Sequence, residues 1–183
     1  MSVDERMVHD IVQKVMANMQ ISGSVSGMHG VFKDMNDAIN ASIEAQKKVC
    51  TMTLDQREQI ISLIRKKTHE NAEILANMGV NETGMGNVGD KILKHHLTAD
   101  KVPGTEDIST VAWSGDRGLT LVEMGPFGVI GAITPATNPS ETVICNCIGM
   151  LAGGNTVVFN PHPNAKKTTI YTINMINEAS IEA

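Results

Sequence analysis

The residues best suited to chemistry form a short polar loop that follows an apolar segment. Residues 129–134 are nearly all apolar and read as a strand covered on both faces. Asn138 suits the N-cap of a helix, Pro139 suits its first position, and Glu141 completes the local capping pattern. The loop that joins this strand to this helix is therefore expected at the carboxyl end of a parallel strand and at a helix N-terminus, where open α/β sheets bind ligands. An ordinary capped turn would show the same pattern. The loop consists of Thr134, Pro135, Ala136, Thr137 and Asn138.

The elements after the loop are expected to complete a right-handed strand–helix–strand unit. The helix ends at Gly153 and Gly154, and residues 156–160 read as the second strand. Pro161, His162 and Pro163 follow that strand. Because parallel strands end at the same edge of a sheet, this segment is expected to form a second wall of the same crevice. The predicted inner face of the helix consists of Val143, Ile144, Cys147, Ile148 and Leu151.

Two helices, at residues 34–49 and 53–78, are expected to precede this unit and to supply packing rather than chemistry. Thr53 and Gln56 form a capping box at the start of the second helix. Gly79 is expected to end it, because glycine often follows the last helical residue. Residues 119–124 read as a further strand.

Residues 1–20 predict a short amphipathic helix, and residues 21–33 a Gly- and Ser-rich flexible linker to a globular part at residues 34–183. A helix this short must bury its apolar stripe, either against the domain of its own chain or against another protein. The linker favours another protein. The stripe consists of Val8, Ile11, Val12, Val15, Met16 and Met19.

A glycine-rich segment imitates a dinucleotide-binding loop. Gly84, Gly86 and Gly89 match the G-x-G-x-x-G pattern. That pattern requires a buried strand immediately before the first glycine, whereas the residues here end a polar helix. The segment is therefore interpreted as a turn between helices.

Composition and charge exclude several classes of function. A chain of 183 residues, 42% of them hydrophobic, can bury one core. Its net charge of −5 argues against nucleic-acid binding, which needs clustered basic residues without an excess of acids. The basic run at residues 65–67 is interpreted as a solvated helix face. No apolar run approaches membrane-spanning length.

The cysteines and histidines predict neither a disulfide framework nor a metal site. Cys50, Cys145 and Cys147 are an odd set without CxxC spacing, so a reducing cytosol and burial as small hydrophobic residues are expected. His95 and His96 are neighbours whose side chains point about 100° apart on a helix. They are interpreted as surface or packing histidines.

The PATNP loop, the NPHP segment at residues 160–163 and the ETGMG turn at residues 82–86 resemble the aldehyde dehydrogenase superfamily. The resemblance is to the CoA-acylating branch of bacterial microcompartments, and it covers essentially the whole chain. It implies an α/β fold, with N-terminal helices followed by the first βαβ part of an NAD-binding domain. In similar microcompartment enzymes a tethered N-terminal helix is an encapsulation peptide that binds shell proteins, which implies this role for the apolar stripe.

The resemblance also implies roles for both loops. Thr134, Pro135 and Ala136 would line the NAD cofactor. Asn138 would donate to the thioester oxyanion, although an ungapped match of the prolines places Thr137 at the usual asparagine. Asn160, His162 and Pro163 would lie beside the adenosine ribose, with Asn160 and Pro163 standing where many members have lysine and glutamate.

Enzymes of this branch use a cysteine thiolate that attacks the aldehyde, loses hydride to NAD⁺ as a thiohemiacetal and passes the acyl group to CoA. That cysteine belongs to a catalytic domain later in the chain, and none of the three cysteines here matches it. The sequence is thus expected to be the N-terminal part of an enzyme that converts acetaldehyde or propionaldehyde in the microcompartment lumen. The part itself is expected to be inactive and the complete enzyme a homo-oligomer. The alternative is a non-catalytic shell or assembly adaptor.

Overall fold

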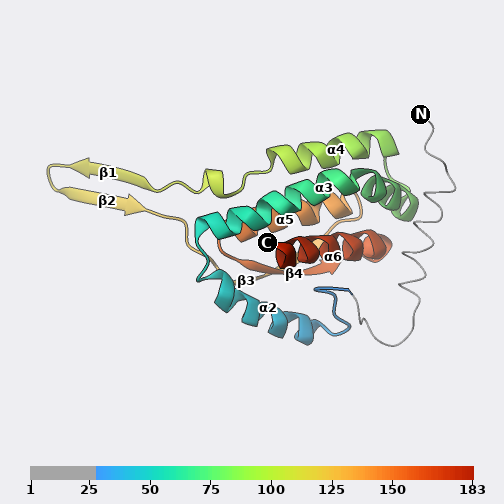
Figure 1. The fold of residues 1–183 in the computed structure, drawn as a ribbon, viewed down its shortest axis with the longest axis horizontal. Helices are drawn as coiled ribbons and strands as arrows, with labels where there is room; N and C mark the ends of the chain where they lie inside the picture. Colours follow the sequence, from blue (N-terminus) through green and yellow to red (C-terminus); the bar gives the residue numbers. More distant parts are fainter. Residues whose placement is uncertain (1–27) are drawn as a thin grey trace.

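The computed structural model describes residues 28–183, in which helices surround a parallel strand pair (Figure 1). The long helix α3 (Leu54–Thr83) contacts α4 (Val88–Lys101), α5 (Pro139–Ala152) and α6 (Lys166–Glu182). Helix α2 (Met35–Val49) lies against the strand pair instead. The predicted N-terminal helix, and the linker as far as residue 27, lie outside the described residues.

The strand–helix–strand unit predicted around the polar loop is present. Strand β3 (Val129–Thr134) pairs in parallel with β4 (Thr156–Pro161), and α5 connects them. The predicted inner face of α5 is confirmed, because Val143, Ile144 and Ile148 are fully buried. The predicted end of the helix is also confirmed, because Gly153 is its C-cap. The expectation that β3 is covered on both faces is wrong for the described residues. Strand side chains alternate between faces, so Thr134 is buried whereas Ile133 is 85% exposed.

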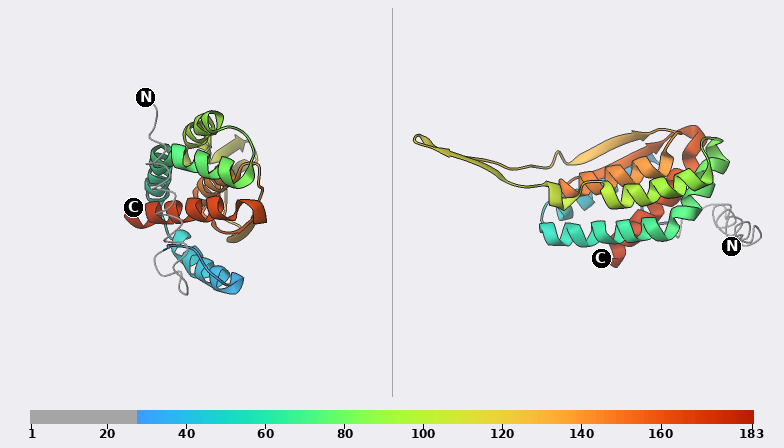
Figure 2. Two further views of the ribbon diagram at one scale, coloured as in Figure 1. Left: turned by 90° about the vertical axis from the view of Figure 1, so that its right-hand side faces the viewer. Right: turned by 90° about the horizontal axis from the view of Figure 1, so that it is seen from above.

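A β-hairpin projects away from the helical body (Figures 1 and 2). It consists of β1 (Val111–Gly115) and β2 (Gly118–Val122), which pair antiparallel through a turn at residues 116–117. The strand expected at residues 119–124 is β2, although it begins at 118 and ends at 122. Its partner β1 was not predicted. Every residue of both strands is exposed, so the hairpin contributes little to the core of the described chain.

Two glycines show how helix α3 ends. The capping box is confirmed, since Gln56 N donates to Thr53 Oγ1 and Thr53 N to Gln56 Oε1. The helix does not stop at Gly79, which is buried within it, but continues to Gly84, whose φ of 68° provides the left-handed C-cap. A glycine inside a helix costs only about 1 kcal/mol, which the packing of α3 against its neighbours outweighs. The glycine-rich segment is confirmed as a turn between helices, whereas α4 itself was not predicted.

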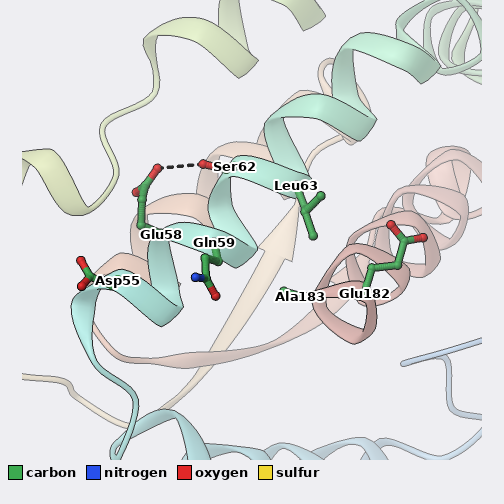
Figure 3. Close-up of a pocket in the computed structure, with 7 residues that line it drawn as sticks. All are labelled: Asp55, Glu58, Gln59, Ser62, Leu63, Glu182 and Ala183. Atoms are coloured by element: carbon green, nitrogen blue, oxygen red, sulfur yellow. Dashed lines mark hydrogen bonds between the residues drawn. The ribbon is translucent and has the colours of Figure 1, made fainter.

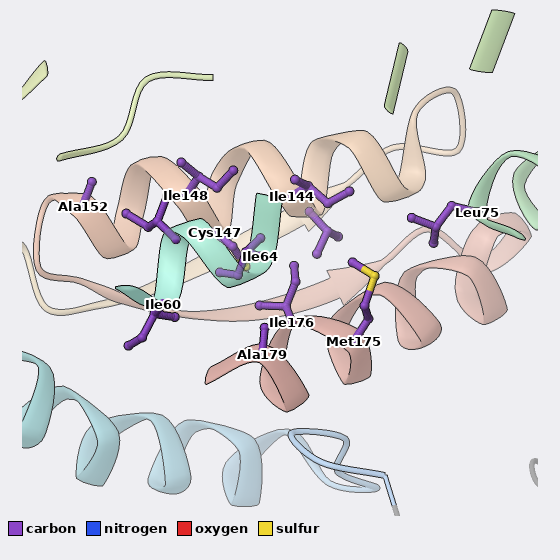
Figure 4. Close-up of a cluster of buried hydrophobic side chains, with 12 residues drawn as sticks. Ile60, Ile64, Leu75, Ile144, Cys147, Ile148, Ala152, Met175, Ile176 and Ala179 are labelled. Carbon is purple, nitrogen blue, oxygen red and sulfur yellow. The ribbon is translucent and has the colours of Figure 1, made fainter. Parts of the chain in front are cut away.

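The core lies where α3, α5 and α6 meet (Figure 4). Ile64 of α3, Ile144 of α5 and Met175 of α6 are all buried there. Fully burying one such side chain stabilises a fold by about 1.5–3 kcal/mol. The members of the cluster are Ile60, Ile61, Ile64, Leu75, Val143, Ile144, Cys147, Ile148, Ala152, Met175, Ile176 and Ala179.

Arginines of α3 fix the ends of the neighbouring helices. Arg57 Nη1 donates to the carbonyl of Ala152 at the end of α5 (3.0 Å), and Arg65 Nη2 donates to that of Val102 after α4 (2.8 Å). A guanidinium there satisfies terminal carbonyls and complements the negative end of the helix dipole. The interpretation of residues 65–67 as a solvated face is therefore wrong for Arg65 and Lys67, whose side chains are only 20% and 17% exposed. Across residues 28–183, none of the helices combines the length and apolar character needed to cross a membrane.

Candidate functional site

The two predicted loops lie at one edge of the strand pair, because Thr134 is paired with Pro161. Thr134 is buried, and its Oγ1 atom has no hydrogen-bond partner within residues 28–183. Pro135 and Thr137 are exposed, and Ala136 and Asn138 are half-buried. On the second loop Asn160, His162 and Pro163 are exposed. A buried hydroxyl without a hydrogen-bond partner is uncommon in folded proteins, and it marks this edge of the strand pair as the candidate site.

Asn138 stands at the N-cap position of α5 without capping it. Its backbone carbonyl accepts from Thr142 N (3.0 Å), as expected of an N-cap residue. Its side-chain Oδ1, however, accepts from Lys94 Nζ (3.0 Å) and from no backbone amide of the helix. The predicted N-cap position of Asn138 is confirmed, but its side chain does not cap the helix. The positive end of the α5 dipole is left facing the loop.

A buried ion pair supports the loop from α4. Lys91 and Glu141 have side chains that are each 6% exposed, and Lys91 Nζ lies 3.4 Å from Glu141 Oε1. The same ammonium donates to the carbonyl of Thr137 (3.2 Å). Glu141 therefore neutralises a buried cation, and the capping role predicted for it is wrong. The pair links α4, α5 and the polar loop through groups that lie 46 and 50 residues apart in sequence.

His95 completes this buried network, which confirms the packing role predicted for it. Its Nδ1 lies 2.6 Å from the carbonyl of Lys91, which can only accept, so Nδ1 carries a hydrogen. Its Nε2 lies 2.7 Å from Ser140 Oγ, which is also 3.1 Å from Glu141 Oε2. Burial lowers the pKa of His95, and the Glu141 carboxylate opposes this in part. The single Ser140 hydroxyl hydrogen can go to Nε2 of neutral His95 or to Glu141 Oε2, whereas a protonated ring leaves it only Glu141.

The lowered pKa of His95 makes the stability of the chain depend on pH. Unfolded His95 takes up a proton near its ordinary pKa of about 6.5, whereas the folded residue does so only at lower pH. The free energy of unfolding is therefore expected to fall as the pH drops below about 6.5, and replacing His95 by glutamine should flatten this slope. Urea unfolding at several pH values measures this slope of the free energy of unfolding. His162→Gln is the control, because it changes an exposed histidine. Equal slopes for wild type and His95→Gln would contradict the assignment.

Two further histidines, His69 and His96, meet between α3 and α4. His69 Nδ1 lies 2.7 Å from His96 Nδ1, and His69 Nε2 lies 2.8 Å from Asp100 Oδ1, all at an exposed seam between α3 and α4. No group of three or more His, Cys, Asp or Glu side chains in residues 28–183 is placed to hold a metal ion.

Two of the three cysteines depart from expectation. Cys147 is buried as predicted, and its burial raises the pKa of the thiol to about 12, so it stays protonated near neutral pH. Cys50 and Cys145 are exposed, which the prediction of burial missed. Cys50 follows the last residue of α2, and Cys145 lies on the side of α5 that faces away from the core.

The surface hollow shown in Figure 3 lies away from the loops. Its volume is about 510 Å³, and none of the predicted site residues lines it. Its charged side chains Asp55, Glu58 and Glu182 are all acidic, so it does not suit an anionic cofactor. The edge beside Thr134, and not this hollow, is therefore the candidate site. The lining residues are Asp55, Glu58, Gln59, Ser62, Leu63, Glu182 and Ala183.

Comparison with known proteins gives the same family as the resemblance of the loop sequence. The model of the aldehyde dehydrogenase family matches residues 15–183. The chain is 46% identical, over 98% of its length, to an acetaldehyde dehydrogenase (acetylating) of Bilophila wadsworthia, and it spans 38% of that protein.

Solved structures are similar to the chain over most of its length. A propionaldehyde dehydrogenase from the Clostridium phytofermentans fucose utilisation bacterial microcompartment is 74% identical, with a TM-score of 0.81. The match covers 84% of this chain and 35% of that one. A Rhodopseudomonas palustris propionaldehyde dehydrogenase, solved with bound CoA and an acylated cysteine, is 46% identical with a TM-score of 0.81 and the same coverage. The chain belongs to the aldehyde dehydrogenase family.

Proposed function

We propose that the chain is the N-terminal part of an NAD-dependent, CoA-acylating aldehyde dehydrogenase. The overall reaction joins a short aldehyde, such as acetaldehyde or propionaldehyde, with CoA and NAD⁺ to give acyl-CoA, NADH and a proton. The observation that carries the proposal is the polar loop beside the unsatisfied Thr134 hydroxyl, in a chain 46% identical to an acetylating acetaldehyde dehydrogenase. The names of the relatives support this enzyme over a non-catalytic adaptor.

The proposed roles follow the two loops. Thr134, Pro135 and Ala136 would line the nicotinamide side of the cofactor, where bound NAD⁺ would supply the hydride acceptor. Asn160, His162 and Pro163 would lie on the ribose side. Asn138 or Thr137 would donate a hydrogen bond to the oxyanion that develops on the substrate, and such a donor contributes about 2.7–4 kcal/mol of transition-state stabilisation.

The nucleophilic cysteine is proposed to come from the part of the enzyme that this chain does not span. The buried Cys147 is held as a thiol by its raised pKa. Cys145 lies seven residues beyond Asn138, about 10 Å along the helix axis at 1.5 Å per residue, and too far to share an oxyanion with it. Cys50 Sγ accepts a hydrogen bond from Gln46 Nε2 at the end of α2, outside both loops.

An assay of the complete gene product tests this function. NADH formation from acetaldehyde and propionaldehyde is measured with and without CoA, and CoA-dependent turnover is expected. Replacing Cys50, Cys145 and Cys147 together by alanine should leave the turnover in place. Turnover by the 183-residue chain alone would contradict the proposed origin of the nucleophile.

Residues 1–20 are proposed to bind shell proteins, which would place the enzyme in the lumen of a bacterial microcompartment. The apolar stripe supports this binding, as does the origin of one similar structure in a microcompartment. The complete enzyme is proposed to be a homo-oligomer, which the exposed apolar side chains of the hairpin support.

Deleting residues 1–20 is expected to abolish co-purification with shell proteins, because the apolar stripe that would be buried at the contact is lost. Ile11→Asp should have the same effect, since it places a charge in the stripe. Lys14→Asp, on the polar face of the same predicted helix, is the matched control. Unchanged shell association of the deletion variant would refute the role of this segment.

A further inference from the structure

Two lysines of α4 hold consecutive residues of the polar loop. Lys91 and Lys94 are three positions apart, so their side chains share one side of the helix. Lys91 Nζ donates to the backbone carbonyl of Thr137 (3.2 Å), and Lys94 Nζ donates to Asn138 Oδ1 (3.0 Å). The Thr137 carbonyl oxygen and Asn138 Oδ1 are therefore turned toward α4.

The contact with Lys94 selects one orientation of the Asn138 amide. An ammonium group has three donors and no acceptor, so only Oδ1 can face it, and flipping the amide would bring two donors together. Oδ1 and Nδ2 diverge from the same carbon, which directs Nδ2 away from Lys94. Nδ2 has no hydrogen-bond partner within the described part of the chain, so both of its hydrogens are available to a ligand.

The support behind this contact is fixed by burial. Lys91 is enclosed between α4 and α5 and paired with Glu141, and its carbonyl is held by His95. The backbone of the loop is thereby tied to a buried cation, whereas Lys94 is exposed and acts only on the side chain of Asn138. Lys94 can therefore be changed without opening the buried network.

We propose that Lys94 is a positioning residue, which orients the side-chain amide of Asn138 so that its N–H groups are available to a ligand at the edge beside Thr134. Lys91 holds the backbone of the same loop. This inference rests on the proposed function and deepens it, because it assigns the oxyanion donor to Asn138 and not to Thr137. Lys91 holds only the backbone carbonyl of Thr137, whereas Lys94 orients the donor-bearing side chain of Asn138.

The orientation is tested by NMR of the ¹⁵N-labelled chain. The side-chain amide signal of Asn138 is assigned by its disappearance in Asn138→Asp. It is expected to shift in Lys94→Met and to keep its wild-type position more closely in Lys94→Arg. Lys101→Met changes another exposed lysine of α4 and serves as the control. An Asn138 amide signal that is the same in wild type and Lys94→Met would overturn the proposal.

The consequence for catalysis is tested in the complete enzyme. Lys94→Met is expected to lower kcat on the order of tenfold, with unchanged KM for NAD⁺ and CoA, because the donor is misoriented and not removed. Lys94→Arg should restore most of the rate. An active wild type whose kcat is unaffected by Lys94→Met would overturn the inference and leave the proposed function standing. A complete protein without CoA-dependent activity would overturn the function, and the NMR result would still decide whether Lys94 orients the amide.

Discussion

Replacing Lys91 by methionine is expected to lower the free energy of unfolding by about 3–5 kcal/mol, because it leaves the buried Glu141 carboxylate without its cation. Both side chains are 6% exposed, so water cannot readily replace the lost partner. The same change also removes the hydrogen bond to the Thr137 carbonyl. Urea unfolding of the 183-residue chain, followed by circular dichroism, measures the effect.

Two further variants separate the buried pair from the mere loss of a lysine. Adding Glu141→Gln to Lys91→Met removes the uncompensated charge and should recover part of the lost stability. Lys66→Met breaks a 3.9 Å pair with Glu70 at an exposed position, where a change within about 0.5 kcal/mol is expected. A cost for Lys91→Met no larger than that for Lys66→Met would show that the Lys91–Glu141 pair is open to water.

Replacing Asn138 by alanine is expected to lower kcat of the complete enzyme by about 10²–10³-fold, the usual loss on removing one oxyanion donor. Asn138→Asp should do at least as much damage, because a carboxylate can still accept from Lys94 but presents no N–H group. Steady-state NADH formation with saturating CoA measures both variants.

Thr137→Ala is the matched control for this donor. Thr137 is exposed, and its carbonyl, which Lys91 holds, survives the substitution. A small effect on kcat is therefore expected. The reverse pattern, in which Thr137→Ala is the damaging change, would assign the oxyanion to the residue that the ungapped match of the prolines favours.

Much of the fold could be predicted because its signals are local. Asp34 and Thr53 cap α2 and α3 through residues two and three positions away. The unit from β3 to β4 was marked by an apolar run, by Pro139 at the start of a helix and by the glycine pair at its end. Periodicity and capping residues predict such elements without any knowledge of the tertiary fold.

The support of the candidate site could not be predicted, because its partners are distant in sequence. Lys91 and Glu141 meet across 50 residues, and His95 and Ser140 across 45. These supporting side chains, Lys91 and His95, lie on α4, a helix that was not predicted from the sequence. Asn138 occupies its predicted N-cap position, but Lys94 takes the side-chain oxygen that a local pattern assigns to the helix backbone.

The projecting hairpin has a spectroscopic consequence. Trp113 is the only tryptophan of the chain, and at 58% exposure it lies on β1, away from the core. Its fluorescence therefore reports on the surroundings of the hairpin and not on the packing of α3, α5 and α6. An indole in contact with water emits at long wavelength, so a shift of this emission toward the blue would signal that another surface has covered the hairpin while the helices remain as they are.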